Sequence, residues 1–209
     1  MEREDRKICP SAGEQKGEGR HLPLLTREER RAAARWAADT TWANQEAYLE
    51  DPVYMECVAD ILSHPVFCSM ERFIQHGSTS CKAHCIQVSY LSYCICQKFG
   101  WDFRTAARAG LLHDLFLYDW HTHARETGDH FHGFTHPRTA LRNAREHFLL
   151  SKEEEEVILR HMWPLTPLPP MSGAGIAVVY ADKLCSLTET ALKVRGWFAV
   201  NFLYRRKFL

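Results

Sequence analysis

The segment Ala109–Trp120, with the sequence AGLLHDLFLYDW, places a histidine next to an aspartate in the middle of an apolar run. Leucines and a phenylalanine flank His113 and Asp114 on both sides, so the pair reads as part of a core helix. Burying an imidazole and a carboxylate costs several kcal/mol unless something pairs them. The segment therefore predicts a partner for both groups inside the protein.

The fold class follows from the spacing of apolar residues on either side of this segment. They recur three and four residues apart, and no alternating pattern of any length suggests a strand. Two capping boxes, Thr26 with Glu29 and Ser151 with Glu154, mark helix starts. The sequence thus predicts an all-α protein with helices over residues 26–51, 53–62, 66–75, 80–99, 102–117, 137–148, 151–163, 175–192 and 195–208.

The chain divides by composition into three parts. Residues 1–22 are rich in charge, Gly and Ser and predict a flexible tail. Residues 23–75 predict N-terminal helices packed on a larger helical domain that spans residues 76–209. Within that domain, the polar, His-rich stretch 118–135 predicts a long connection, and loops of that length are usually functional or mobile.

Composition excludes some classes of protein. Of the 209 residues, 45% are hydrophobic and 25% charged, as in an ordinary soluble globular protein. Lys plus Arg equals Asp plus Glu at 26 each, so we expect no duplex nucleic acid as partner. No signal peptide or transmembrane-length run is visible, so we expect no membrane and a cytoplasmic location. The eight Cys lack a CxxC pair, which favours reduced, mostly buried thiols over disulfides.

Several metal-ligand residue types fall on the apolar stripes of predicted helices, namely His84, His113, His161 and Asp182. An aspartate there is not expected to stay ionised without a cation. Four helices converging on a metal would explain the set, and nitrogen and oxygen donors suit Mn, Fe, Zn, Co or Ni. The alternative is that each histidine is a hydrogen-bonded core residue and that Asp182 pairs with Lys183 or Arg108.

The ordered pattern His84, His113-Asp114, Asp182 resembles the HD-domain metal-dependent phosphohydrolase superfamily, named for its His-Asp dyad. The resemblance covers residues 76–192, where AGLLHDLFLYDW, HGFTHPRTALRNA, ILRHMWPL and VVYADKLCSL all look like HD-domain segments. It implies an HD-domain-like helical bundle with an N-terminal helical extension.

The resemblance also implies a ligand set. His84, His113, Asp114 and Asp182 match the four ligands of a mononuclear HD site. His136 and His161 match the two further histidines of HD domains that hold two ions, in which Asp114 would bridge. The complete set therefore favours two divalent transition-metal ions.

Departures from two branches of the superfamily leave the substrate open. The cyclic-dinucleotide phosphodiesterase branch carries a Gly-Tyr-Pro signature and a His-His pair, but here Met162 follows His161. The deoxynucleotidase branch resembles HDxxE, but Leu117 stands where that glutamate would be. The expected activity is therefore hydrolysis of a phosphate ester, with a phosphorylated small molecule or a nucleotide as substrate.

Candidate catalytic groups lie close to the predicted ligands in sequence. Lys183, Arg138 and Arg160 are candidates to stabilise phosphate charge, with surface salt bridges as the alternative. Asp119 is the nearest acid to the missing glutamate and a weak substitute for it. The 118–135 connection would cover the pocket.

The same residues are also compatible with functions other than phosphate-ester hydrolysis. Some HD domains hold two irons that activate dioxygen, and four His with two Asp fit such an oxygenase equally well. A non-catalytic scaffold that binds a nucleotide or a partner is a further alternative. The arm before residue 60 and the aromatic residues Trp197, Phe198, Phe202 and Tyr204 suit either a homodimer contact or packing within the domain.

Overall fold

A computed structural model describes residues 47–76, 79–119 and 132–206, with side chains in the last range described through Ala191. The predicted tail, the helix from residue 26, most of the 118–135 connection and the C-terminal aromatic side chains lie outside the described residues. In chain order the elements are η2 (Ala47–Glu50), α2 (Pro52–Leu62), α3 (Pro65–Ser69), η3 (Met70–Arg72), β1 (Ile74–His76), β2 (Thr79–Ser80), α4 (Cys81–Phe99), α5 (Phe103–Leu112), α7 (His132–His147), α8 (Lys152–Arg160) and α9 (Gly173–Arg206).

The described part is mostly helical, as predicted, with one small exception. β1 and β2 form a two-stranded antiparallel pair in which Ile74 lies opposite Ser80 and His76 opposite Thr79. The expected helix over 66–75 is therefore wrong in its second half: α3 ends at Ser69, and a short 3-10 turn leads into β1. The pair is too short for an alternating pattern to have signalled it.

Local capping explains where the central helices begin and end. The Ser80 hydroxyl accepts a hydrogen bond from the amide of Ala83 at the start of α4. Gly100, with φ of 67°, closes the other end of α4, and a left-handed C-cap of this kind favours glycine. At α8 the Ser151–Glu154 capping box forms in both directions, as predicted.

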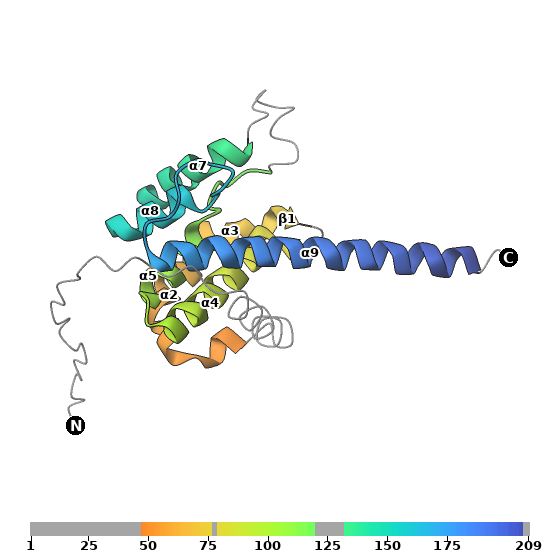
Figure 1. The fold of residues 1–209 in the computed structure, drawn as a ribbon, viewed down its shortest axis with the longest axis horizontal. Coiled ribbons are helices and arrows are strands. Elements are labelled where there is room, and N and C mark those ends of the chain that lie inside the picture. Colours follow the sequence, from red (N-terminus) through yellow and green to blue (C-terminus); the bar gives the residue numbers. More distant parts are fainter. Residues whose placement is uncertain (1–46, 77–78, 120–131, 207–209) are drawn as a thin grey trace.

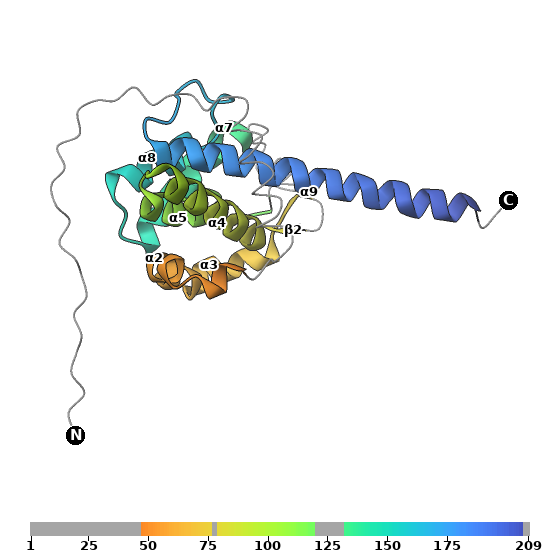
Figure 2. The ribbon, with the colours of Figure 1, turned by 60° about the horizontal axis from the view of Figure 1, so that its bottom comes forward.

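The core lies where α4, α5 and α9 pack together, with α2 against α5. Figure 1 shows α7 and α8 as a pair on one side of this group, and in both views α9 crosses the body and extends far beyond it (Figures 1 and 2). α8 packs on α5 and α9, so the α7–α8 pair is anchored to the same core. None of the described helices has the length and apolarity that crossing a membrane requires.

Small residues let α4 and α5 approach each other closely. A Cβ added at Gly110 would lie 2.6 Å from the Cα of Ser89. The Ser89 hydroxyl donates a 2.6 Å hydrogen bond to the carbonyl of Ala107 and lies 2.8 Å from the hydroxyl of Tyr54 on α2. This contact fixes the distance between α4, which carries His84, and α5, which ends at Leu112 directly before His113.

Helix α5 ends earlier than predicted. The expected helix over 102–117 stops at Leu112, and Leu117 adopts a left-handed backbone with φ of 60°. The buried Asn143 of α7 donates a 2.8 Å hydrogen bond to the carbonyl of Leu115, which the end of the helix leaves without a helical partner. The side chain of Asn143, from a later helix, thus supplies the hydrogen bond that a further helical turn would have given. The sequence around Leu112 contains no local signal for this helix end.

Other helix boundaries also differ from expectation. α7 begins at His132, five residues before the predicted start, with Pro137 inside it. Proline favours the first turn of a helix, so a start at residue 137 is the default expectation. The two helices predicted over 175–192 and 195–208 form the single helix α9.

The described cysteines form no disulfide, and six of the seven are buried, in agreement with the predicted burial.

The buried Arg108 connects three elements. Its guanidinium donates to Glu154 of α8 at 2.8 Å, to Asp60 of α2 at 2.7 and 3.0 Å, and to the carbonyl of Cys57 at 2.9 Å.

We expect Arg108→Met to lower the free energy of unfolding by about 3–5 kcal/mol, because it leaves the carboxylate of Glu154 buried without its cation. Urea unfolding measures this. The exposed Arg142→Met is the control, and a loss of less than 1 kcal/mol in Arg108→Met would contradict the role of this network.

The close contact at Gly110 gives a second prediction. Gly110→Ala should lower the free energy of unfolding by about 1–3 kcal/mol, because the added methyl group meets backbone atoms that cannot move aside. Thermal unfolding followed by circular dichroism tests it. In the control Gly133→Ala, the methyl group meets only the ends of Leu165 and Met162, so stability should be unchanged or higher. Equal behaviour of the two variants would refute the packing argument.

Candidate metal centre

The fold brings all six predicted ligand residues together. They come from five helices: His84 from α4, His113 and Asp114 from the end of α5, His136 from α7, His161 from the end of α8, and Asp182 from α9. None is more than 8% exposed. Six buried polar side chains at one place need charges and hydrogen bonds that compensate one another.

The cluster has two halves that share Asp114. Donor atoms of His84, His113 and Asp114 all lie within 4.8 Å of one another, and so do donor atoms of Asp114, His136 and His161. We call the first the His84 group, to which Asp182 also belongs by its contacts, and the second the His136 group.

In the His84 group, imidazole nitrogens face carboxylate oxygens. Nε2 of His84 lies 3.3 Å from Oδ1 of Asp182, and Nε2 of His113 lies 3.8 Å from the same oxygen. Nε2 of His113 is also 3.4 Å from Oδ2 of Asp114. The four side chains thus present two nitrogens and two carboxylates to a common point.

In the His136 group, two imidazoles face the other oxygen of Asp114. Oδ1 of Asp114 lies 3.2 Å from Nε2 of His136 and 3.5 Å from Nε2 of His161. The two Nε2 atoms are themselves 2.8 Å apart. Each oxygen of Asp114 therefore faces a different half, which is the arrangement a bridging carboxylate requires.

Hydrogen bonds on the far side of the rings orient the nitrogens. Nδ1 of His113 donates to the carbonyl of Gly110, and Nδ1 of His161 donates to the carbonyl of Ile158, both at 2.8 Å. A carbonyl only accepts, so Nδ1 carries the hydrogen and the neutral ring has its lone pair on Nε2. Histidines that bind metals are commonly held in this way.

Two buried atoms in the cluster test whether a cation fits there. Nε2 of His113 and Oδ1 of Asp114 are buried and have no hydrogen bond among the described residues, although both face groups of opposite polarity. A native protein rarely leaves such atoms unsatisfied. A divalent ion would satisfy both, so the residues fit a metal.

The electrostatics of the cluster also fit a bound cation. Burial alone would raise the pKa of Asp114, but His113 and His136 hold it well below its ordinary value. Burial, with His136 and His113 nearby, lowers the pKa of His161 to about 3, so this ring stays neutral and able to bind a metal. Burial would lower the pKa of His84, but Asp182 and Glu189 raise it well above the ordinary value. The carboxylates of Asp182 and Glu189 thus favour a positive charge, from a proton or a metal ion, in the His84 group.

Of the four catalytic candidates, Lys183 lies beside the cluster. Nζ of the half-exposed Lys183 lies 3.5 Å from Oδ2 of Asp182 and donates to the carbonyl of His161 at 3.3 Å. Arg160 instead contacts Glu156 and the carbonyl of Pro169, as its salt-bridge interpretation predicts. Asp119 is exposed at the end of the described segment.

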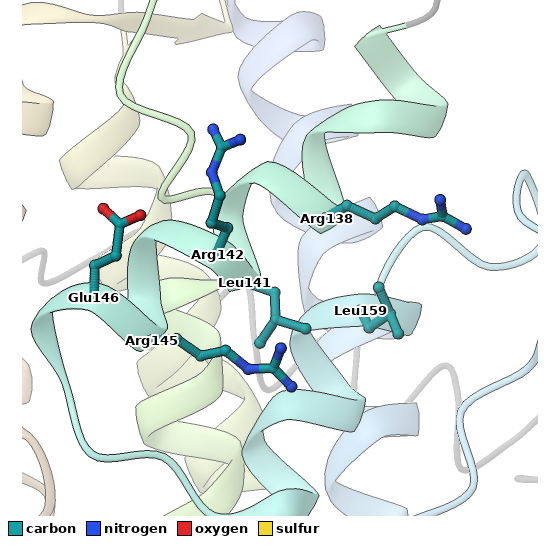
Figure 3. A pocket seen from close by; sticks show the side chains of 6 residues that line it. All are labelled: Arg138, Leu141, Arg142, Arg145, Glu146 and Leu159. Atoms are coloured by element: carbon teal, nitrogen blue, oxygen red, sulfur yellow. The ribbon is translucent and has the colours of Figure 1, made fainter.

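Arg138 does not point toward the cluster. It is exposed on the outer face of α7 and lines a surface cleft with Arg142, Arg145 and Leu159 (Figure 3). Residues two apart on a helix face different sides, so a buried His136 places Arg138 outward. The expectation that it contacts phosphate has no support from its position.

Two residues at the cluster were not foreseen from the sequence. Both oxygens of the buried Glu189 lie within hydrogen-bonding distance of Nδ1 of His84, at 3.1 and 3.2 Å. The amide of Gln75, from β1, donates to Oδ2 of Asp114 at 2.5 Å. Glu189 stands seven residues after Asp182, a helical spacing that would have placed both on one face of α9. Gln75 carries no such signal, because β1 was expected to be helix.

Comparisons with family models, with curated proteins and with solved structures find no match to this chain.

Metal binding should be visible as stabilisation. Protein stripped with a chelator should gain thermal stability when Mn²⁺, Co²⁺ or Zn²⁺ is added, by about 2.7 kcal/mol at a free ion concentration one hundred times Kd. Differential scanning calorimetry measures the shift. His113→Ala should abolish it, whereas His147→Ala, an exposed histidine of α7, should retain it. The same shift in both variants would place the ion elsewhere.

Proposed function

We propose that the chain is a metal-dependent hydrolase of phosphate esters, built as an HD-type domain with two divalent ions. The observation that carries the proposal is Asp114, a buried carboxylate whose two oxygens face two separate groups of imidazole nitrogens. The ligand order along the chain is the one that the resemblance to the HD superfamily implies.

The donor atoms limit the choice of ion. The two halves offer imidazole nitrogen and carboxylate oxygen. The buried thiols of Cys81 and Cys85 approach the dyad from outside, at 3.6 Å from the carbonyl of Asp114 and 3.9 Å from Nδ1 of His113. Mixed nitrogen and oxygen ligands suit Mn, Fe, Zn, Co or Ni.

The bound ions would act as Lewis acids on a phosphate oxygen and lower the pKa of a water molecule to give the attacking hydroxide. The chain's own groups set the rest of the chemistry. Asp114 and Asp182 supply the negative charge that holds the ions. Lys183 extends a cation beside Asp182 on the partly exposed side of the site, where it can bind the charged oxygens of a phosphate ester.

The dyad also bears on the substrate. The half-buried Leu117 occupies the third position after Asp114, so the described residues offer no carboxylate there to donate a proton to the leaving group. This position therefore does not narrow the substrate, and we propose the class that the resemblance implies, a phosphorylated small molecule or a nucleotide.

A phosphate-release assay tests the proposal. Protein reloaded anaerobically with Mn²⁺ or Co²⁺ should release phosphate or a nucleotide product from a panel of phosphomonoesters, nucleotides and cyclic dinucleotides. Asp114→Asn should lose both metal and activity. Lys183→Ala should keep its metal content, measured by inductively coupled plasma mass spectrometry, and lose about 100-fold in kcat/KM, because one charge that stabilises the transition state is gone.

Arg138→Ala is the matched control, because Arg138 lies on the outer face of α7 and should leave kcat/KM unchanged. Turnover that requires dioxygen and iron, with no phosphate release from any ester in the panel, would contradict the proposal and favour an oxygenase.

A further inference from the structure

We infer that Gln75 is a positioning residue of the metal centre, which holds Asp114 so that its two oxygens face two different groups of ligands. The inference rests on the proposed two-ion centre and adds a residue that acts through a ligand. Gln75 does not bind an ion itself. Its amide keeps the bridging carboxylate at the angle that both ions need.

A bulge in the β1–β2 pair determines where Gln75 points. Ile74 lies opposite Ser80 and His76 opposite Thr79, so two steps along β1 match one step along β2. Gln75 is the extra residue between the two pairs. An extra residue of this kind bends its strand and re-aims the local side chain, and such bulges are frequent next to active sites.

The burial pattern of β1 is the reverse of what the hydrophobic effect favours. Ile74 is 41% exposed, whereas the polar side chain of Gln75 is only 7% exposed. A strand with one face toward the core normally buries its apolar residues, and a buried amide is costly unless it forms hydrogen bonds. The strand therefore buries Gln75 for a contact that an apolar side chain cannot make.

That contact is with the bridging carboxylate. The amide nitrogen of Gln75 donates to Oδ2 of Asp114 at 2.5 Å. Oδ2 is also the oxygen that lies 3.4 Å from Nε2 of His113, while Oδ1 faces His136 and His161. The two oxygens of a carboxylate turn together about one bond, so a donor that fixes Oδ2 also fixes Oδ1.

The strand that carries Gln75 is itself fixed to α4. The amide of Cys81, the first residue of α4, donates to the carbonyl of Phe73 at 2.7 Å, directly before β1. The hydroxyl of Ser80, in β2, caps the same helix end. Gln75 thus reaches Asp114 from an anchored backbone, which is what precise orientation of a ligand requires.

The other end of the amide indicates a role beyond folding. Oε1 of Gln75 is buried and has no hydrogen bond within the described part of the chain. An ionised carboxylate only accepts, so the amide cannot turn its oxygen toward Asp114 instead. A side chain kept for stability alone should have both ends of its amide satisfied. Gln75 satisfies only the end that holds the carboxylate.

A purely structural account is that Gln75 compensates the charge of Asp114 in the folded chain and has no influence on a metal. The two accounts diverge for Gln75→Met, which has a similar length and forms no such hydrogen bond. In the structural account, an ion replaces the lost donor, so metal affinity is unchanged or higher. If Gln75 positions Asp114, metal affinity falls, because the freed carboxylate must be oriented on binding.

The experiment is a titration of the chelator-stripped full chain with Co²⁺, followed by calorimetry and by the visible absorption of the bound ion. Gln75→Met should weaken Co²⁺ binding by about 10–100-fold and change the visible spectrum, because the ligand geometry is altered. Gln75→Asn keeps the amide on a shorter side chain that does not reach Asp114, so it should weaken binding as well.

The matched control is Gln97→Met. The amide of Gln97 donates to the hydroxyl of Tyr93 at 2.7 Å near the C-terminal end of α4, whereas His84 lies near the start of that helix. This variant loses an equivalent hydrogen bond away from the centre, so it should bind Co²⁺ with the affinity and spectrum of the wild type.

Unchanged or tighter Co²⁺ binding in Gln75→Met would overturn the inference and leave the proposed function in place. No Co²⁺ binding in the wild type would overturn both. Circular dichroism verifies that each variant folds. If Gln75→Met does not fold, Gln75→Asn decides the question by the same measurement.

Discussion

The structure depends on the charge balance around Asp114. A carboxylate buried to this extent must be matched by positive charge, and the surrounding helices each contribute a group that faces it or its neighbours. His113 follows α5 directly, and His136 and His161 arrive from α7 and α8. α5 ends at Leu112, and the side chains of both His113 and Asp114, which follow it directly, face the cluster.

Neighbouring contacts make this arrangement rigid. The approach of Gly110 to Ser89 sets the distance between α4 and α5, and Arg108 ties α5 to α2 and α8 through Asp60 and Glu154. Because ligands on α4, α5 and α8 depend on these two contacts, the packing of small residues and a buried ion-pair network determine the geometry of the centre. Precise positioning of ligands by such surroundings is what separates a metal site from a collection of polar residues.

The sequence predicted the parts of the molecule that depend on local patterns. Helical spacing identified the main helices, and the capping box at Ser151 placed the start of α8 correctly. The six cluster residues were found because each interrupts an apolar stripe or matches a family segment. Longer-range features were missed: the end of α5 depends on Asn143 of a later helix, and Gln75 reaches Asp114 from a strand too short to show a period. Arg138 was proposed from its nearness to His136 in sequence, but residues two apart on a helix face different sides, and Arg138 is exposed on α7.

The division of ligands among helices links the centre to folding. Asp182 and Glu189 come from α9, the last helix, so the His84 group cannot form until that helix has docked on α4. The His136 group instead depends on the α7–α8 pair, which packs on one side of the core (Figure 1). In the proposed two-ion centre, a local opening of that pair would release the ion of the His136 group while the other stays bound. Hydrogen exchange in α7 and α8 would then respond to that ion separately from the rest of the domain.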